Sequence, residues 1–240
     1  MESTSFDNPY NPEGYIQNMI DRMPETWVKR YIYGSWENLQ DAVFAEFIES
    51  VHVVDPILKI PDSWASTAGM DYGYKNPSAI VWGAVNYDDD IFIFDEFYSA
   101  QKTPDELAIE AKRHGQLLTI IDPSTKTPDR DGKDVFHELI TRGVRLKTAN
   151  KDKKRNIGTT NMLFKQRRLF ITRNCVNLIR EIKAYHWKTL KIGEDQKKDS
   201  PEEVVKKDDH AVDAMMYLLA HIVDMYSIEP QAIKPEHTLQ

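Results

Sequence analysis

The fold is decided by residues 66–85, STAGMDYGYKNPSAIVWGAV. This stretch predicts a short strand that ends at Asp71, a tight loop around Gly73 and Pro77, and a second strand over 79–85. Glycine at position 73 permits backbone angles that other residues resist, so main chain and a bound ion could approach closely there. Asp71 alone has two interpretations, because an aspartate at this place is either a turn residue that bonds its own backbone or a ligand. The positions of the other carboxylates decide between them.

The composition is that of a globular chain whose charges are unevenly distributed. Hydrophobic residues make up 41% and charged residues 29% of the 240 residues, which is enough for one large core and argues against wholesale disorder. The single cysteine, Cys175, excludes an intrachain disulfide and indicates a reducing compartment. The formal net charge of −7 does not by itself predict a nucleic-acid binder. The segment 147–173 is nevertheless basic, as in a protein that grips a polyanion beside a cation site, or in an ordinary solvated surface.

Predicted strands and helices alternate from residue 65 onward. Further strands are expected over 91–98, 117–121, 144–147 and 169–171, and helices over 103–115, 133–141, 152–166, 174–184 and 208–224. Thr103 and Glu106 are expected to form a capping box at the start of the first of these helices, and Gly115 is expected to end it. Short polar turns join the first three strands and predict an antiparallel meander, and the alternation that follows predicts parallel strands. The expected fold class is therefore α/β, with a central mixed sheet, antiparallel meander plus parallel strands, flanked by helices.

The ends of the chain differ from its middle. Residues 1–61 are interrupted by prolines, hold too little apolar material for a core of their own, and are interpreted as an appendage and linker. Residues 62–226 are expected to form the main domain, and 227–240 a loose C-terminal tail. Residues 186–205 are expected to form a hairpin or mobile loop. The N-terminus is polar and acidic, which predicts no secretory signal, and no apolar run approaches the roughly 20 residues of a membrane helix.

Three aspartates occur where the predicted elements could bring them together. Asp71 ends the first strand, Asp122 ends the fourth, and Asp213 lies in the last helix, in reach of Asp209 and His210 one turn earlier. Ligands collect at the carboxyl ends of strands in open α/β sheets, so parallel neighbouring strands would place the first two at one edge. A carboxylate beside the apolar stripe of the last helix needs a partner. Alternatively, the acids at 208 and 209 only complement the helix dipole.

Oxygen ligands of this kind suit Mg²⁺ or Mn²⁺ better than zinc. Two such ions held by shared carboxylates activate a water and clamp an in-line displacement at phosphorus. Phosphodiester hydrolysis is therefore the chemistry that these residue types support best.

Four sequence motifs follow one another along the chain, and their order indicates a family. They are GMDYGYKNPSA around Asp71, LLTIIDPS around Asp122, a basic helix leading to RRLFI, and DDHAVDAMMYLL at 208–219. Together, over about residues 66–220, they resemble the nuclease half of the phage large terminase subunit. The resemblance implies an RNase H-like fold and a metal-dependent DNA endonuclease that cuts concatemeric viral DNA during genome packaging.

The resemblance also implies roles for individual residues. Asp71, Asp122 and Asp213 would be ligands of two Mg²⁺ or Mn²⁺ ions, with Asp71 shared between them. His210 would be a ligand, a proton carrier or a residue that orients a ligand, or else a histidine that only caps the helix. Asp209 would bind the second ion or orient Lys207.

Further partners follow from the N-terminal segment. Its runs NPEGYIQNM, RYIYGSW and VFAEF resemble the end of the family's ATPase half, while no GxxxxGK[ST] phosphate loop occurs. The chain is therefore interpreted as a fragment without the motor. The family implies double-stranded DNA, the terminase ATPase domain, the portal protein and the small terminase subunit as partners, and the host cytoplasm as location.

Basic side chains are the predicted DNA contacts. They are Lys151, Lys153, Lys154, Arg155, Arg167, Arg168 and Lys188, with Lys191, Lys197 and Lys198 on the expected hairpin. Asp95 and Glu96 are expected on a strand outside the site. Two other functions remain open: a non-catalytic DNA clamp or docking module, and an RNase H-like nuclease that acts on RNA hybrids or branched DNA.

Overall fold

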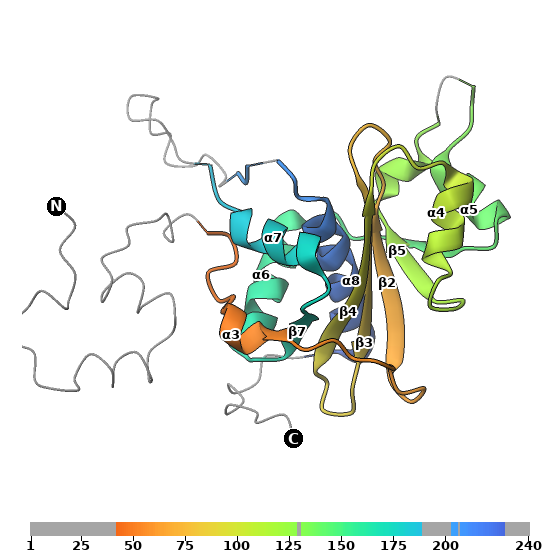
Figure 1. Cartoon of the computed structure of the whole chain (residues 1–240). Helices are drawn as coiled ribbons and strands as arrows, with labels where there is room; N and C mark the ends of the chain where they lie inside the picture. The colour runs from red at the N-terminus through yellow and green to blue at the C-terminus, as the bar shows by residue number, and fades with distance from the viewer. Residues whose placement is uncertain (1–41, 129–130, 189–202, 206, 229–240) are drawn as a thin grey trace, which may run out of the picture.

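The centre of the molecule is a seven-stranded mixed sheet. The computed structural model describes residues 42–128, 131–188, 203–205 and 207–228. Its strands are β1 (Val53–Val54), β2 (Ala65–Asp71), β3 (Ser78–Val85), β4 (Ile91–Ser99), β5 (Leu118–Ile121), β6 (Arg145–Thr148) and β7 (Leu169–Thr172). They lie in the order β1-β7-β4-β3-β2-β5-β6, as Figure 1 shows in part.

The meander and its parallel continuation are both confirmed. The strands β2, β3 and β4 pair antiparallel, and β5 then runs parallel to β2, with Met70 opposite Ile121. The remaining pairs, β5 with β6, β4 with β7 and β1 with β7, are also parallel. Every residue of β3 is buried, because helices cover both faces of the sheet.

Helices form a layer on each side of the sheet. They are α3 (Glu49–His52), α4 (Pro104–Ala111), α5 (Val135–Thr141), α6 (Lys153–Lys165), α7 (Val176–Ala184) and α8 (His210–Tyr226), with a 3-10 turn η2 at Pro123–Lys126. In Figure 1, α4 and α5 cover one face, and α6, α7 and α8 cover the other. The capping box predicted for α4 is present, since Thr103 accepts a hydrogen bond from the Glu106 N–H. The mixed sheet flanked by helices confirms the predicted fold class.

One close approach seats α8 on the sheet. A Cβ built on Gly69 of β2 would lie 1.9 Å from the Ala214 carbonyl oxygen. Glycine is required at this position because the helix backbone occupies the space of a side chain. The contact lies two residues before Asp71 on the strand and beside Asp213 on the helix, so it sets how near these two residues come.

The packed part of the chain begins before residue 61. Val43, Phe44 and Phe47 are buried in the same core as α6, α7 and α8, and Phe44 stacks on Tyr185 with ring centroids 5.5 Å apart. The two residues of β1 then extend the edge of the sheet. These apolar side chains find their core in the sheet domain. Residues 1–41 and 229–240 lie outside the described residues.

The expected hairpin is described only at its base. Trp187 and Val204 form an antiparallel bridge, and the Lys188 N–H donates to the Glu203 carbonyl. Lys191, Lys197 and Lys198 lie outside the described residues. Among the residues that are described, no helix is both long and apolar enough to span a membrane.

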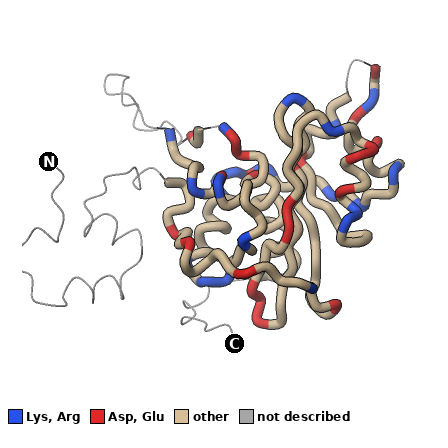
Figure 2. Tube along the Cα trace, in the orientation of Figure 1, with Lys and Arg blue, Asp and Glu red and all other residues tan. Residues whose placement is uncertain are grey.

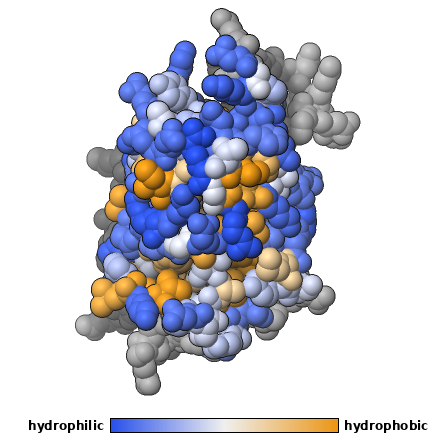
Figure 3. Space-filling model, turned by 90° about the vertical axis from the view of Figure 1, so that its right-hand side faces the viewer, coloured by the Kyte–Doolittle hydropathy of each residue, from blue (hydrophilic) through white to orange (hydrophobic). Residues whose placement is uncertain are grey.

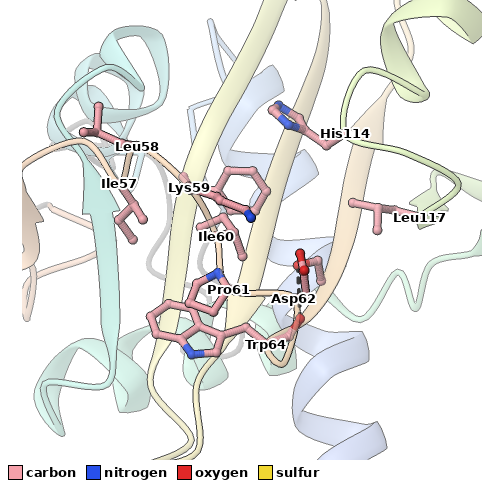
Figure 4. Close-up of a pocket in the computed structure, with 11 residues that line it drawn as sticks. Ile57, Leu58, Lys59, Ile60, Pro61, Asp62, Trp64, His114 and Leu117 are labelled. Atoms are coloured by element: carbon pink, nitrogen blue, oxygen red, sulfur yellow. Dashed lines mark hydrogen bonds between the residues drawn. The ribbon is translucent and has the colours of Figure 1, made fainter.

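A pocket opens at the starts of β2 and β5. It has a volume of about 490 Å³ and is bounded by Ile60, Trp64, His114 and Leu117 (Figure 4). It therefore lies at the opposite edge of the sheet from the strand ends at Asp71 and Asp122. The surface around α4 and α5 is mostly hydrophilic, with separate apolar groups on it (Figure 3).

Candidate active site

The ends of β2 and β5 bring two of the predicted aspartates to one edge of the sheet. Since Met70 and Ile121 are paired, Asp71 and Asp122 are the next residues along parallel neighbouring strands. Helix α8 crosses β2, β3 and β5 and carries Asp213 to the same edge. The charges act on one another, because Asp71 experiences repulsion from Asp122 and Asp209, and Asp213 from Asp209 and Asp71. The structure therefore collects carboxylates from three separate elements.

Asp71 is paired with the first residue of α8. The His210 Nδ1 lies 2.8 Å from Asp71 Oδ2, and about a sixth of each side chain is exposed. Burial raises the pKa of Asp71, although the hydrogen bond to His210 opposes it. That hydrogen bond also raises the pKa of His210 against the effect of burial. This hydrogen bond orients the Asp71 carboxylate.

Asp122 is held in its charged form by three groups. It accepts hydrogen bonds from the Ser124 N–H at 2.5 Å and from the Tyr217 hydroxyl at 2.9 Å, and Lys151 Nζ lies 2.8 Å from its Oδ1. Burial alone would raise the pKa of Asp122, but these contacts outweigh it and lower the pKa. Asp122 is consequently a fixed, ionised carboxylate at neutral pH.

Asp213 has the least satisfied carboxylate of the three. Burial raises its pKa to about 6, with opposition from Lys153 and reinforcement from Asp209 and Asp71. Its Oδ1 is buried and forms no hydrogen bond, and Lys153 Nζ lies 3.2 Å from it. The same ammonium group is 3.5 Å from Asp209 Oδ2. Burial disfavours the charged Lys153, but its partners outweigh burial and raise its pKa.

The cluster has the chemistry of a site for hard divalent cations. Its donors are carboxylate oxygens, two of the acids have raised pKa values, and the buried Asp213 Oδ1 is compensated by an ion pair with Lys153. Lysine ammonium groups stand where cations are needed, at Asp122 and between Asp209 and Asp213. In the described part of the chain, no three His, Cys, Asp or Glu side chains are already grouped to hold a metal ion. These residues fit a site in which divalent ions would replace the lysines as the counter-charges of the carboxylates.

The predicted DNA-contacting residues divide into two groups. Lys151 and Lys153 contact the carboxylates themselves, Lys154 is exposed, and Arg155 pairs with Asp224 on α8. Lys188, at the base of the expected hairpin, is paired with Glu203. Basic and acidic positions are interspersed along the described part of the chain (Figure 2). Arg167 and Arg168 follow the far end of the 13-residue helix α6, about 20 Å from its start.

The prediction that Arg168 contacts DNA is wrong. Its side chain is fully buried, donates to the Asp89 carbonyl at 3.0 Å and pairs with the Asp89 carboxylate at 3.2 Å. Arg168 directly precedes β7, so its contacts with Asp89 fix the turn between β3 and β4 next to the start of that strand. A guanidinium inside the fold cannot reach a phosphate without unfolding its surroundings.

Two residues of this neighbourhood were missed in the sequence. Tyr217 lies four residues after Asp213, so helical spacing puts both on one side of α8. Glu181 is an acid between the apolar Ile179 and Ile182 of α7, and it is buried. An acid inside an apolar stripe was the signal that could have found it.

Comparison with known proteins identifies the domain. Residues 71–221 match the family described as Terminase RNAseH like domain, a span that contains Asp71, Asp122, His210 and Asp213. The chain belongs to this family. The resemblance to the terminase nuclease domain is thereby confirmed. A curated relative, the large terminase subunit of Escherichia phage T5, is 20% identical over 226 residues. The match covers 90% of this terminase chain and 50% of that protein, so the chain spans about half its relative's length.

Solved terminase structures share the fold. A large terminase from a thermophilic bacteriophage has a TM-score of 0.62 and 21% identity over 92% of this chain and 55% of its own. The P22 large terminase nuclease domain has a TM-score of 0.61 and 15% identity, and the match covers 77% of this chain and 92% of that one. The large terminase nuclease of thermophilic phage G20c, solved with bound magnesium, has a TM-score of 0.56 and 12% identity. The match covers 75% of this chain and 97% of that one. At these identities the likeness establishes the RNase H-like fold.

Proposed function

We propose that this terminase domain is a metal-dependent DNA endonuclease that cuts viral DNA during packaging by two-metal phosphodiester hydrolysis. The observation that carries the proposal is the convergence of Asp71, Asp122 and Asp213 at one sheet edge, with lysine ammonium groups neutralising them. The bound magnesium of the G20c nuclease supports a divalent ion as cofactor. Mg²⁺ or Mn²⁺ suits an all-oxygen ligand set best.

The metal would be held by Asp71, Asp122 and Asp213, with Asp209 beside them. When bound, such ions polarise the phosphoryl oxygens and lower the pKa of a water molecule, which supplies the nucleophile. His210 fixes the orientation of Asp71 through Nδ1 and can hold a proton there, because its pKa is raised. These side chains therefore bring the ligands to the reaction already oriented.

The substrate side is formed by the start of α6 and by η2. Lys151 and Lys153 are counter-ions of the carboxylates now, and metal binding would release them toward phosphates. Lys154 and Arg155 continue this basic segment along α6, Lys188 lies at the base of the expected hairpin, and Arg167 follows the far end of α6. A pocket of about 290 Å³ lined by Tyr72, Ser124 and other residues adjoins the carboxylate edge and offers room for a neighbouring nucleotide.

The wider packaging role is part of the same proposal. The ATPase domain of the terminase would precede this domain, and the portal protein and the small terminase subunit would be partners in the infected host's cytoplasm. The match to about half of a large terminase subunit supports this arrangement. Residues 1–61 would then include the end of the ATPase half.

Plasmid cleavage with Mn²⁺ or Mg²⁺ tests the activity. Asp71→Ala, Asp122→Ala and Asp213→Ala are each expected to lose at least about 100-fold in rate, with the circular dichroism of the wild type. Asp95→Asn is the matched control, because Asp95 is a half-buried carboxylate on β4 that pairs with His114 at 2.7 Å, outside the cluster. EDTA should stop the wild-type reaction. A wild-type rate in Asp71→Ala with Mn²⁺ would show that the assignment is wrong.

A non-catalytic DNA clamp is the second candidate. It is favoured by the ion pairs of Lys151 and Lys153, which neutralise the acids without a metal. Calorimetric titration separates the two functions, since a clamp would bind DNA but neither take up Mn²⁺ at the aspartates nor cleave. A comparison of plasmid, RNA hybrid and junction substrates tests the remaining choice of nucleic acid.

A further inference from the structure

The first turn of α8 is held by a side chain from another helix. Glu181 of α7 accepts hydrogen bonds at Oε2 from the Ala211 N–H at 2.7 Å and from the Val212 N–H at 3.1 Å. Its side chain is completely buried. The first N–H groups of a helix have no partner within the helix, so Glu181 satisfies two that would otherwise be buried and unpaired. A carboxylate at this end also complements the helix dipole.

This contact changes what Asp209 does. Asp209 is the residue that precedes α8, and an aspartate there ordinarily accepts from the second or third N–H of its own helix. Those two groups belong to Ala211 and Val212, and Glu181 occupies them. Asp209 makes no side-chain capping bond, and its carboxylate lies 3.5 Å from Lys153 Nζ. Because Glu181 caps α8 from outside, the Asp209 carboxylate can join the cluster.

A second helix, α7, is also capped by a carboxylate from another element, at a place farther from the site. Glu96 of β4 accepts from the Asn177 N–H at 2.8 Å and the Leu178 N–H at 2.9 Å, at the start of α7. Cys175, the residue before α7, makes no side-chain capping bond. Two carboxylates in series therefore fix α7 to the sheet and α8 to α7. Helix α8, which is the last element fixed in this way, carries His210 and Asp213.

We infer that Glu181 is a positioning residue of the proposed nuclease, which aligns the first turn of α8 so that Asp209, His210 and Asp213 face the sheet edge. The inference rests on the proposed function. The rest of α8 is anchored independently, because Met215, Leu218, Leu219 and Ile222 are buried in the core. Loss of Glu181 should therefore leave the helix in place and disturb mainly its first turn. Without its partner, that turn would draw Asp209 into the ordinary capping position and away from the cluster.

Calorimetric titration of the full chain with Mn²⁺ tests this role. Glu181→Ala is expected to raise the dissociation constant at least about tenfold, whereas Glu181→Gln, which keeps an acceptor oxygen, should stay within about threefold. Glu106→Ala is the matched control, because Glu106 belongs to the capping box of α4 on the other face of the sheet. It removes a helix cap but should leave the Mn²⁺ dissociation constant unchanged.

A second readout requires no metal. Amide exchange of the Asp213 N–H, which donates to the Asp209 carbonyl at 2.8 Å, should accelerate at least about tenfold in Glu181→Ala and not in Glu106→Ala. Unchanged exchange and an unchanged dissociation constant in Glu181→Ala would overturn the inference, as would equal losses in Glu181→Gln and Glu181→Ala. A wild type that takes up no Mn²⁺ would instead overturn the proposed function, and the exchange rates would still decide whether Glu181 positions α8.

Discussion

Asp213→Asn should make the metal-free protein more stable while it abolishes cleavage. Burial and neighbouring acids raise the pKa of Asp213 from 3.8 to about 6. A shift of about two pKa units corresponds to about 3 kcal/mol by which the fold disfavours the ionised carboxylate. Since 21% of the side chain is exposed, solvent screening reduces the expected gain to about 1–3 kcal/mol at pH 7.5.

The sign of the pH dependence follows from linkage. Between pH 3.8 and about pH 6 the folded protein binds the proton of Asp213 more strongly than the unfolded chain does, so this group's contribution to stability falls as pH rises. The loss of stability that the ionised Asp213 causes is complete above about pH 6 and absent below pH 3.8. The advantage of Asp213→Asn should therefore shrink as the pH falls from 7.5 to 4.5.

Urea unfolding in EDTA at pH 7.5 and pH 4.5 measures both quantities. Asp224→Asn is the matched control on the same helix, because Asp224 forms a surface pair with Arg155 and such pairs contribute about 0–1 kcal/mol. Mn²⁺ should reverse the order of stabilities, since a ligand stabilises only the protein that binds it. The reasoning fails if Asp213→Asn is no more stable than the wild type at pH 7.5, or if its gain is the same at both pH values.

Two further substitutions test how the site is assembled. Gly69→Ala puts a Cβ 1.9 Å from the Ala214 carbonyl, so we expect about 1–3 kcal/mol lower unfolding free energy and loss of cleavage, whereas Gly158→Ala, with open space around it, should be neutral or stabilising. Unimpaired stability in Gly69→Ala would contradict the close packing of α8. Tyr217→Phe removes the hydroxyl that donates to Asp122, so calorimetry should show a several-fold weaker Mn²⁺ affinity at a cost of about 1 kcal/mol or less. Unchanged affinity would mean that the hydroxyl does not orient Asp122.

Local patterns predicted the elements because they depend on near neighbours. The Thr103 and Glu106 capping box predicted where α4 begins, and apolar runs predicted β2 to β5 to within a residue or two of their observed bounds. The α4 helix itself ends at Ala111, before the glycine at 115 that was expected to stop it. Helix ends depend on packing as well as on the stop residue.

The burial of charges was beyond prediction from spacing. Arg168 lies among basic residues and resembles a phosphate contact, yet its side chain is inside the fold with Asp89, 79 positions earlier. Lys151 and Lys153 likewise occupy a basic segment, but Lys151 forms an ion pair with Asp122 after β5 and Lys153 with Asp213 of α8. Composition identifies a basic run but not which face of it meets solvent.

The amino-acid sequence by itself determined the order of strands and helices, the strand-end positions of Asp71 and Asp122, and the helical position of Asp213. It did so because hydrophobic period, caps and turns act over a few residues. Only the tertiary structure decided that Glu181 caps α8 and that lysines neutralise the aspartates. The capping contact joins residues 30 positions apart, and Lys153 reaches an aspartate still farther along the chain. Such contacts exist only where packing across the sheet brings the elements together.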